Sequence, residues 1–351
     1  MISIKSIRFY EAIKPLKVTF STALGKKDVM RSVIVKSRLD NGLCGIGECP
    51  TSFVLKQETV PRIKEILTEA SRLFLDTPIA EYEGKVKDLR KKYFQYPMTI
   101  SGLEVALFRA YLACRHESQH GHWGGIHNSL ETDITIPFIT DPVLLDKWIG
   151  RMAAIGFSAF KLKVIGNIEA DKIYISHIYE KLKNMTEDFT IRLDGNQGYT
   201  EKTFLRLIDF LTKKDYKIEL FEQPLSKTDY PGFKEIKKHS PMPIILDETV
   251  FTVHDLMRVV QEDLGHGVNI KIAKSGISES LNIFSMAKAH DLRLMIGCMT
   301  ETMTGLSAGI YFALGTGGFD YIDLDAVHFL HHKKRYGDIN IEGCRYTLAH
   351  S

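Results

Sequence analysis

The chain has 351 residues, of which 44% are hydrophobic and 25% are charged, and its formal net charge is +3. These values are ordinary for a globular protein, and so small a charge gives no reason to expect nucleic acid or an anionic membrane as a partner. The five cysteines form no C-x-x-C pair, and no apolar run is long enough to span a bilayer. We therefore expect a cytoplasmic protein with reduced thiols, large enough for two domains or for one barrel with an addition.

Three strand patterns open the chain, at residues 2–10, 30–38 and 43–47. The second and third are joined at Asn41-Gly42, a pair that favours a tight hairpin turn. Three helical patterns follow, at residues 56–74, 80–92 and 101–116. Strands followed by a run of helices predict an α+β domain, which we place at residues 1–125.

From about residue 133 the pattern changes to an alternation of strand and helix. Short apolar runs predict eight strands, at residues 134–138, 159–164, 190–194, 218–222, 244–247, 268–271, 293–296 and 321–324. Helical segments such as 168–184 and 200–213 separate them. Repeated strand–helix units of this length are typical of a (β/α) barrel, which we place at residues 126–329.

Three of the predicted barrel strands end in a carboxylate: Asp194, Glu222 and Asp247. One acidic residue at a strand end is usually a helix cap, but the carboxyl ends of barrel strands converge, so three unpaired carboxylates there would repel each other. Together they form a hard-oxygen site that suits Mg²⁺. We predict one Mg²⁺ per subunit at these three residues, with Asn196 and Glu248 as outer partners.

Lysines flank the predicted metal site. Lys161 and Lys163 are two residues apart on one strand, so both face the barrel interior, where an idle lysine is rare; the alternative is a pair that snorkels to solvent. Lys271 ends a strand four positions further round the barrel. A base here needs its pKa lowered from about 10.4 toward about 7–8, and a second ammonium group and a nearby Mg²⁺ both act in that direction. Lys274 follows in the loop, where we expect a solvated charge.

This constellation resembles the enolase superfamily, in its muconate-lactonizing subgroup. The matching segments are K-x-K at 161–163, D-G-N-Q at 194–197, E-Q-P at 222–224, D-E at 247–248 and K-x-x-K at 271–274. The resemblance covers nearly the whole chain. A D-x-D at Asp323 and Asp325 narrows it to the dipeptide epimerases, in which this pair holds the N-terminal amine of the substrate. The resemblance implies an α/β fold, a modified (β/α)₇β TIM barrel with an N-terminal α+β capping domain that the C-terminal tail, residues 330–351, completes.

The activity that the resemblance implies is isomerisation, by two-base 1,1-proton transfer at the α-carbon of the C-terminal residue of a dipeptide. Lys163 or Lys271 removes the α-proton, and the opposite lysine returns a proton to the other face. Lys161 contacts the substrate and, with Mg²⁺, stabilises the enolate. The expected substrate is L-Ala-D/L-Glu, a fragment of murein peptide, and we expect a homo-oligomer.

Other substrate contacts follow from the same resemblance. Thr135 on the first barrel strand and Met299 after the seventh line the barrel mouth in relatives, although Met299 suits the core equally well. The segments 20–27 and 50–59 close over the barrel in relatives. Three lysines there, Lys26, Lys27 and Lys56, could meet an acidic side chain, but lysines in such loops are more often solvated.

Two alternatives stay open at this point. The first is another member of the subgroup, such as o-succinylbenzoate synthase, N-acylamino acid racemase or muconate cycloisomerase. The aspartates Asp323 and Asp325 argue against it, because those substrates have no free ammonium group for them to hold. The second is a non-catalytic protein that binds a sugar acid or an amino acid, which would not need paired lysines.

Overall fold

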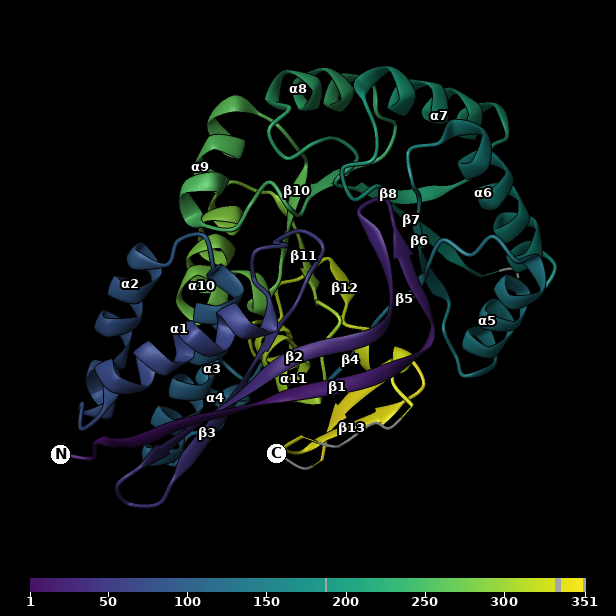
Figure 1. Ribbon diagram of the computed structural model, residues 1–351. Coiled ribbons are helices and arrows are strands. Elements are labelled where there is room, and N and C mark those ends of the chain that lie inside the picture. Colours follow the sequence, from purple (N-terminus) through teal and green to yellow (C-terminus); the bar gives the residue numbers. More distant parts are fainter. Residues whose placement is uncertain (187, 332–335, 350–351) are drawn as a thin grey trace.

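A computed structural model describes residues 1–186, 188–331 and 336–349 and consists of an N-terminal α+β unit and a barrel surrounded by helices (Figure 1). The N-terminal elements are β1 (Ile4–Thr22), β2 (Gly25–Leu39), β3 (Cys44–Pro50), α1 (Val60–Phe74), η1 (Ile79–Glu81), α2 (Tyr82–Lys92), α3 (Pro97–Cys114) and α4 (Gln119–His122). The three strands form an antiparallel sheet in the order β1-β2-β3. Among the described residues, no helix combines the length and the apolar character needed to cross a bilayer.

The predicted hairpin at Asn41-Gly42 is confirmed. The amide of Gly42 donates to the carbonyl of Leu39 at 3.1 Å, and the Asn41 side chain accepts the amide of Leu43 at 3.1 Å. Gly42 has a φ of 89°, a backbone conformation that glycine adopts without steric cost. This turn sets the pairing of β2 with β3 along the whole of β3.

The predicted lengths of the first two strands were wrong. β1 and β2 pair as far as Thr22 and Gly25, so residues 20–27 form the tip of a long hairpin rather than a loop. A register shift between Pro15 and Phe20 interrupts the ladder, because proline has no amide to donate and the apolar alternation is lost there. In Figure 1 the tip of this hairpin reaches across to the ends of the barrel strands.

α3 is buried along nearly its whole length. Its backbone lies directly against β3, because glycines remove the side chains from the contact. A Cβ on Gly47 would collide with the carbonyl oxygen of Gly102, and one on Gly45 would collide with that of Ala106. The helix is therefore clamped between the N-terminal sheet and the barrel helix α10, which it also contacts.

The eight predicted barrel strands are confirmed, with boundaries shifted by no more than two residues. They are β5 (Ile134–Ile136), β6 (Ala159–Lys163), β7 (Thr190–Asp194), β8 (Ile218–Glu222), β9 (Ile244–Leu246), β10 (Gly267–Ile270), β11 (Arg293–Gly297) and β12 (Tyr321–Asp323). They pair in parallel in chain order. The ring is drawn together where the amide of Asp133 donates to the carbonyl of Ile322 at 3.2 Å and that of Leu324 to the Thr132 hydroxyl at 2.7 Å. The predicted fold class is confirmed.

Helices cover the outside of this ring: α5 (Pro142–Ala154), α6 (Ile168–Lys183), α7 (Glu201–Lys213), α8 (Tyr230–His239), α9 (Val253–Glu262), α10 (Ile272–Ala289) and α11 (Met303–Thr316). The short η2 (Ala326–Phe329) follows β12 at the mouth of the barrel. α7 shows why the outer helices form. Thr200 caps its N-terminus, and Phe204, Leu207, Ile208 and Leu211 recur at helical spacing on its buried face. Each such side chain contributes about 1.5–3 kcal/mol by leaving water.

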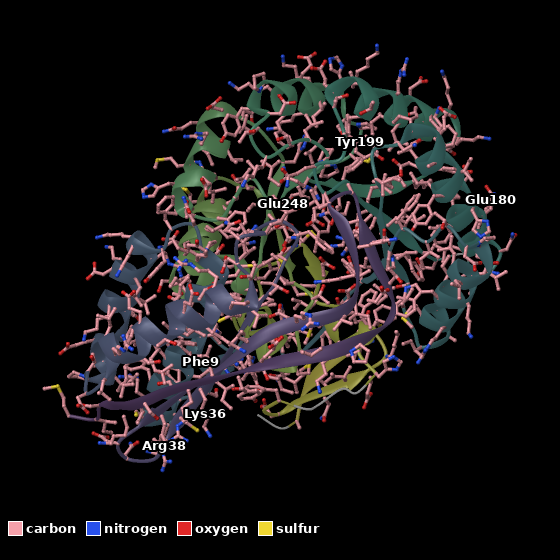
Figure 2. The ribbon with its side chains drawn as sticks, viewed as in Figure 1. Phe9, Lys36, Arg38, Glu180, Tyr199 and Glu248 are labelled. Atoms are coloured by element: carbon pink, nitrogen blue, oxygen red, sulfur yellow. The ribbon has the colours of Figure 1, made fainter. Side chains whose placement is uncertain are left out.

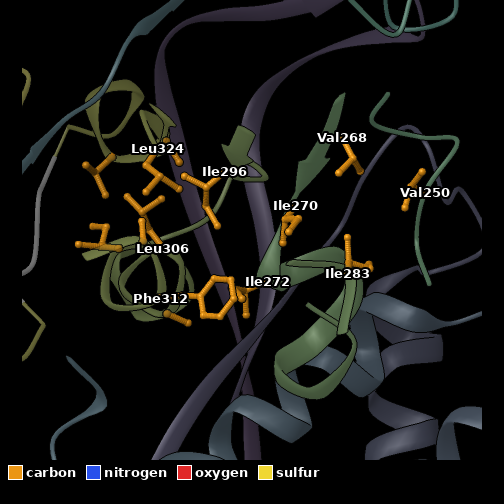
Figure 3. Close-up of a cluster of buried hydrophobic side chains, with 14 of the residues drawn as sticks. Val250, Val268, Ile270, Ile272, Ile283, Ile296, Leu306, Phe312 and Leu324 are labelled. Atoms are coloured by element: carbon orange, nitrogen blue, oxygen red, sulfur yellow. The ribbon is translucent and has the colours of Figure 1, made fainter. Parts of the chain in front are cut away.

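Alternation along the strands divides the barrel core into two parts. Outward residues such as Ile270 and Ile296 join Ile283, Leu306 and Phe312 of the helices in one apolar cluster, shown in Figure 3. A separate cluster fills the inside of the ring: Leu220, Ile245, Met295 and Tyr321. This inner plug closes the barrel beneath the charged strand ends, so that a ligand can approach them only from the mouth.

The C-terminal tail forms a hairpin of β13 (Ile339–Glu342) and β14 (Arg345–Leu348). β14 pairs with β4 (Ser129–Glu131), a strand that the sequence analysis missed and that leads into the barrel. Assignment of residues 330–351 to the capping domain, and the boundary near residue 125, stay predictions. Part of that tail, 332–335 and 350–351, lies outside the described residues.

Candidate active site

A cavity opens at the carboxyl ends of the barrel strands. Its floor is formed by charged strand ends, among them Lys161, Lys163 and Lys271. The hairpin tip of β1 and β2 and the segment 51–54 form its outer wall. Figure 2 places Glu248 within the ring of strands, whereas Glu180 lies on its outer surface. The predicted catalytic lysines therefore share one cavity.

Each carboxylate predicted to bind a metal is paired with lysine. Lys163 contacts Asp194. The ammonium nitrogen of Lys161 lies 3.1 Å from Glu222 and 3.8 Å from Asp194. That of Lys271 lies 2.7 Å from Asp247 and 4.0 Å from Glu222. Two of the lysines thus each bridge two neighbouring carboxylates, as a shared cation would.

The prediction that Lys274 is a solvated loop charge was wrong. Its side chain is 1% exposed, and its ammonium group donates to Asp247 Oδ1 at 2.8 Å and to the carbonyls of Asp247 and Asn269 at 2.7 and 2.9 Å. The chain turns helically directly after β10, with the amide of Lys274 donating to the carbonyl of Lys271 at 2.9 Å. Residues three apart on a helical turn share a face, so the K-x-x-K spacing is itself a sign that Lys274 lies on the same side as Lys271.

Protein groups alone do not lower the pKa of the bridging lysines, contrary to the expectation for a base. Burial acts to lower the pKa of Lys271, but the carboxylates of Asp247 and Glu222 outweigh it and raise the pKa above its ordinary value. The pKa of Lys161 is raised in the same way, with Asp323 as the largest opposing charge. Both are therefore ammonium ions while the carboxylates face them directly.

Within the described residues, the cluster holds seven buried carboxyl groups and five buried cations: Asp133, Asp194, Glu222, Asp247, Glu248, Asp323 and Asp325 against Lys161, Lys163, Arg192, Lys271 and Lys274. The excess of two carboxyl groups cannot stay ionised without a cost. Burial, together with the charges on Asp247 and Asp194, raises the pKa of Glu248 to about 8. A divalent cation would balance this excess.

Several buried polar atoms also lack a partner among the described residues. Three of them, Asn196 Oδ1, Glu248 Oε2 and Asn269 Oδ1, lie beside the strand-end carboxylates, and two more are Asp133 Oδ1 and Asp323 Oδ1. The backbone at Asn196 has a φ of 38° and that at Gln223 a φ of 36°, in the left-handed region that such residues enter at a cost. Unpaired oxygens and strained turns at one end of the barrel fit a site that holds a cation.

A second acidic set lies close by. Among the described residues, the ligand oxygens of Asp133, Asp323 and Asp325 lie within 4.8 Å of one another, whereas those of Asp194, Glu222 and Asp247 do not form such a set. The aspartates of the second set already have partners: Arg192 for Asp133, Lys161 for Asp323 and the Thr135 amide for Asp325.

The remaining predicted substrate contacts also reach the cavity. Thr135, Met299, Asp323 and Asp325 all line it. Thr135 is fixed from both sides, because its amide donates to Asp325 at 2.6 Å and its carbonyl accepts Trp148 Nε1 at 3.2 Å.

Of the three lysines that were considered for an acidic substrate group, only Lys27 lines this cavity. Its ammonium nitrogen lies 5.5 Å from the ring centre of Phe53, and it forms no ion pair with a residue that the structure describes. Burial lowers the pKa of Lys27 to about 8. Lys26 and Lys56 are exposed, as expected of solvated lysines.

Two further residues, which were not predicted from the sequence, hold the carboxylates in place. Asn269 donates to Glu222 Oε1 at 2.7 Å, and the Gln223 side chain accepts the amide of Asp247 at 2.8 Å. Both had a signal. Asn269 is two residues before Lys271 on the same face of β10, and Gln223 directly follows a predicted ligand in the E-Q-P segment.

Fold and site together define a barrel enzyme whose cavity contains lysines on opposing strands, next to a buried cluster with an excess of carboxyl groups. Residues 145–350 match the family described as "Enolase C-terminal domain-like". An L-Ala-D/L-Glu epimerase from Thermotoga maritima is 31% identical over 92% of this chain and 90% of its own length. The chain therefore belongs to the enolase superfamily, and it is an isomerase.

Solved structures agree with this assignment. The substrate-liganded L-Ala-D/L-Glu epimerase from Bacillus subtilis has a TM-score of 0.91 and 28% identity, over 99% of this chain and 96% of that one. A dipeptide epimerase from Enterococcus faecalis, complexed with Mg and L-Leu-L-Tyr, has a TM-score of 0.89 and 28% identity, over 99% and 97%. Relatives of similar identity are thus named for, or complexed with, different dipeptides.

Proposed function

We propose that this protein is a Mg²⁺-dependent dipeptide epimerase that inverts the α-carbon of the C-terminal residue. The observation that carries the proposal is the placement of Lys163 and Lys271 in one cavity, on strands four apart in the ring, with carboxylates between them. A one-base reaction would not need the second lysine. The dipeptide epimerases among the relatives favour this activity over the other reactions of the subgroup.

Asp194, Glu222 and Asp247 are the residues that would hold Mg²⁺. Their oxygens are hard donors, and Asn269 and Gln223 orient two of these strand ends. When bound, Mg²⁺ would supply positive charge next to the substrate carboxylate and so favour the negative charge that develops there.

The chain's own lysines perform the proton transfer. One of Lys163 and Lys271, as the neutral amine, takes the α-proton as the C–H bond breaks, and the electron pair moves into the substrate carboxylate. A cation bound to Asp247 and Glu222 would weaken the carboxylate charge that otherwise keeps Lys271 an ammonium ion. Lys161, which lies between Asp194 and Glu222, donates hydrogen bonds to that developing charge. The opposite lysine then gives its proton to the other face of the carbon. Solvent exchange restores the two lysines.

Asp323 and Asp325 are proposed to bind the free α-ammonium group. Replacing both by asparagine should reduce kcat/KM for free dipeptides by a factor that corresponds to a loss of about 2–5 kcal/mol in transition-state stabilisation. The reason is that an ammonium ion would be left poorly paired in a desolvated pocket. An N-acetylated amino acid, which has no charge at that position, should lose much less. Because Asp323 also pairs with Lys161, Asp325→Asn alone is the matched control and should show the same preference more weakly. Equal losses on both substrates would assign these aspartates to the fold or the metal.

Lys27 is a suitable partner for an acidic side chain on the C-terminal residue of the substrate, as in L-Ala-D/L-Glu. Lys27→Met should lower kcat/KM for L-Ala-L-Glu by about 10- to 100-fold, the value of a hydrogen bond to a charged group, and leave L-Ala-L-Leu nearly unchanged. In the wild type, the preference for Glu over Leu should fall as the pH rises through about 8, since the cation is lost there. Lys26→Met, a change at the exposed neighbouring lysine, should keep both the preference and its pH profile. If neither substitution changes the preference for Glu over Leu, Lys27 does not bind the acidic side chain.

The function itself is tested by screening a dipeptide library in D₂O with Mg²⁺ for exchange of the α-proton of the C-terminal residue. A dipeptide epimerase exchanges and inverts that centre, whereas a binding protein does neither. Exchange confined to N-acylated amino acids would place the protein with the N-acylamino acid racemases instead. A homo-oligomeric state and a cytoplasmic location stay predictions.

A further inference from the structure

Lys271 and Lys274 lie on a segment that is held by the N-terminal unit as well as by the barrel. The residues after β10 make one helical turn, and the helix is then broken at Gly276, which has a φ of 80° and a ψ of −171°. The second part of α10 starts afresh at Ile277. The first amides of the second part have no partner within the helix, so the position of the short turn before them depends on what binds those amides.

The group that binds them comes from the N-terminal unit. Glu104 of α3 is 1% exposed, and its Oε2 accepts the amide of Ile277 at 3.0 Å. Its Oε1 accepts the amide of Ser278 at 3.0 Å and the Ser278 hydroxyl at 2.6 Å. Arg90 of α2 holds the same carboxylate at 2.8 Å. A Cβ on Gly276 would collide with Glu104, so glycine is needed both for the backbone turn and for this approach.

A second contact from α3 reaches the residue next to the lysine. The Ser101 hydroxyl donates to the carbonyl oxygen of Ile272 at 2.9 Å, and both groups are buried. Ser101 and Glu104 are three residues apart, so they occupy one face of α3 and hold the turn at both of its ends. α3 is itself fixed, because Glu58 accepts its first amides, those of Met98 and Thr99, at 3.0 and 2.8 Å.

We propose that Glu104 and Ser101 are positioning residues for Lys271, so that the N-terminal unit sets the place of one of the two bases through α3. The inference rests on the proposed two-base function and adds a dependence on one side only. Lys163 ends β6, on the other side of the ring, whereas α3 lies beside α10 (Figure 1). Disturbing α3 at these residues should therefore displace Lys271 and leave Lys163 in place.

The test compares the two diastereomers of the dipeptide that the wild type exchanges fastest in D₂O. The diastereomer that faces Lys271 is defined as the one whose exchange is lost in Lys271→Ala. Glu104→Gln keeps the shape of the side chain but turns one acceptor oxygen into a donor, so at least one amide of α10 loses its partner. Exchange of the diastereomer that faces Lys271 should fall about tenfold to a hundredfold relative to the other, as expected for a misplaced catalytic group.

Glu48→Gln is the matched control. Glu48 is 2% exposed and accepts the amides of Thr302 and Gly305 at the start of α11, so the same change weakens an equivalent contact between the N-terminal unit and the barrel. The strand before α11 contributes no lysine to the site, so the ratio of the two exchange rates should stay within about twofold of the wild type.

Ser101→Ala removes the second contact and leaves the carboxylate cap intact. It should shift the exchange ratio in the same direction by a smaller factor, and it decides the question if Glu104→Gln does not fold. Equal slowing of both diastereomers in Glu104→Gln and Ser101→Ala, or no slowing in either, would overturn the inference and leave α3 with a purely structural role. Absence of exchange in the wild type would instead defeat the proposed function.

Discussion

Epimerisation should stop in both Lys163→Ala and Lys271→Ala, with a loss of at least about 10²–10⁴-fold, the usual contribution of a positioned acid or base. Each variant should still exchange the α-proton of one diastereomer, and the two variants should retain opposite ones. The reason is that the two lysines have separate partners, Asp194 for Lys163 and Asp247 for Lys271, so that loss of one leaves the other in place. Deuterium incorporation measured by NMR for each pure diastereomer gives the answer.

The arginine variants at the same positions separate the base from the ion pair. Lys163→Arg and Lys271→Arg keep a cation beside the carboxylate but cannot release a proton near neutral pH. They should therefore show the same one-sided exchange as the alanine variants, with less disturbance of the cluster. A single variant that exchanges both diastereomers would mean that one mobile base serves both faces.

Asp247→Asn should abolish turnover and weaken Mg²⁺ binding by more than the about 10- to 100-fold typical of an outer partner. Asp247 is central to the cluster, because its two oxygens meet Lys271 and Lys274. Titration calorimetry measures the binding, and circular dichroism shows whether the fold survives. Removal of Mg²⁺ by a chelator should stop the wild type reversibly, and full activity after exhaustive chelation would exclude a metal role.

Asp133→Asn distinguishes the two acidic sets. If Mg²⁺ binds at Asp194, Glu222 and Asp247, this variant should retain most of its affinity, although it loses the ion pair with Arg192. If the metal instead lies among Asp133, Asp323 and Asp325, the affinity should collapse in Asp133→Asn and survive in Asp247→Asn.

Local patterns determined much of this protein. The hairpin at Asn41-Gly42 needs only its own two residues, and each barrel strand is a short apolar run with its own helix. The charged residues at the strand ends follow from the same register, because parallel strands bring their carboxyl ends to one place. The amino-acid sequence alone is therefore enough to predict that Lys161, Lys163, Lys271, Asp323 and Asp325 share one cavity.

Other features of the protein depend on contacts between segments that are distant in sequence. The sequence pattern does not show that the β1–β2 hairpin extends to the cavity, because the ladder shifts register after Pro15. The strand at 129–131 forms by pairing with the C-terminal tail. Lys274 looks like a loop charge until Asp247 and Asn269 surround it. Glu104 is a helix residue with no visible partner until the break at Gly276, far along the chain, meets it. In each case packing brings the two partners together, and the local sequence around one partner does not identify the other.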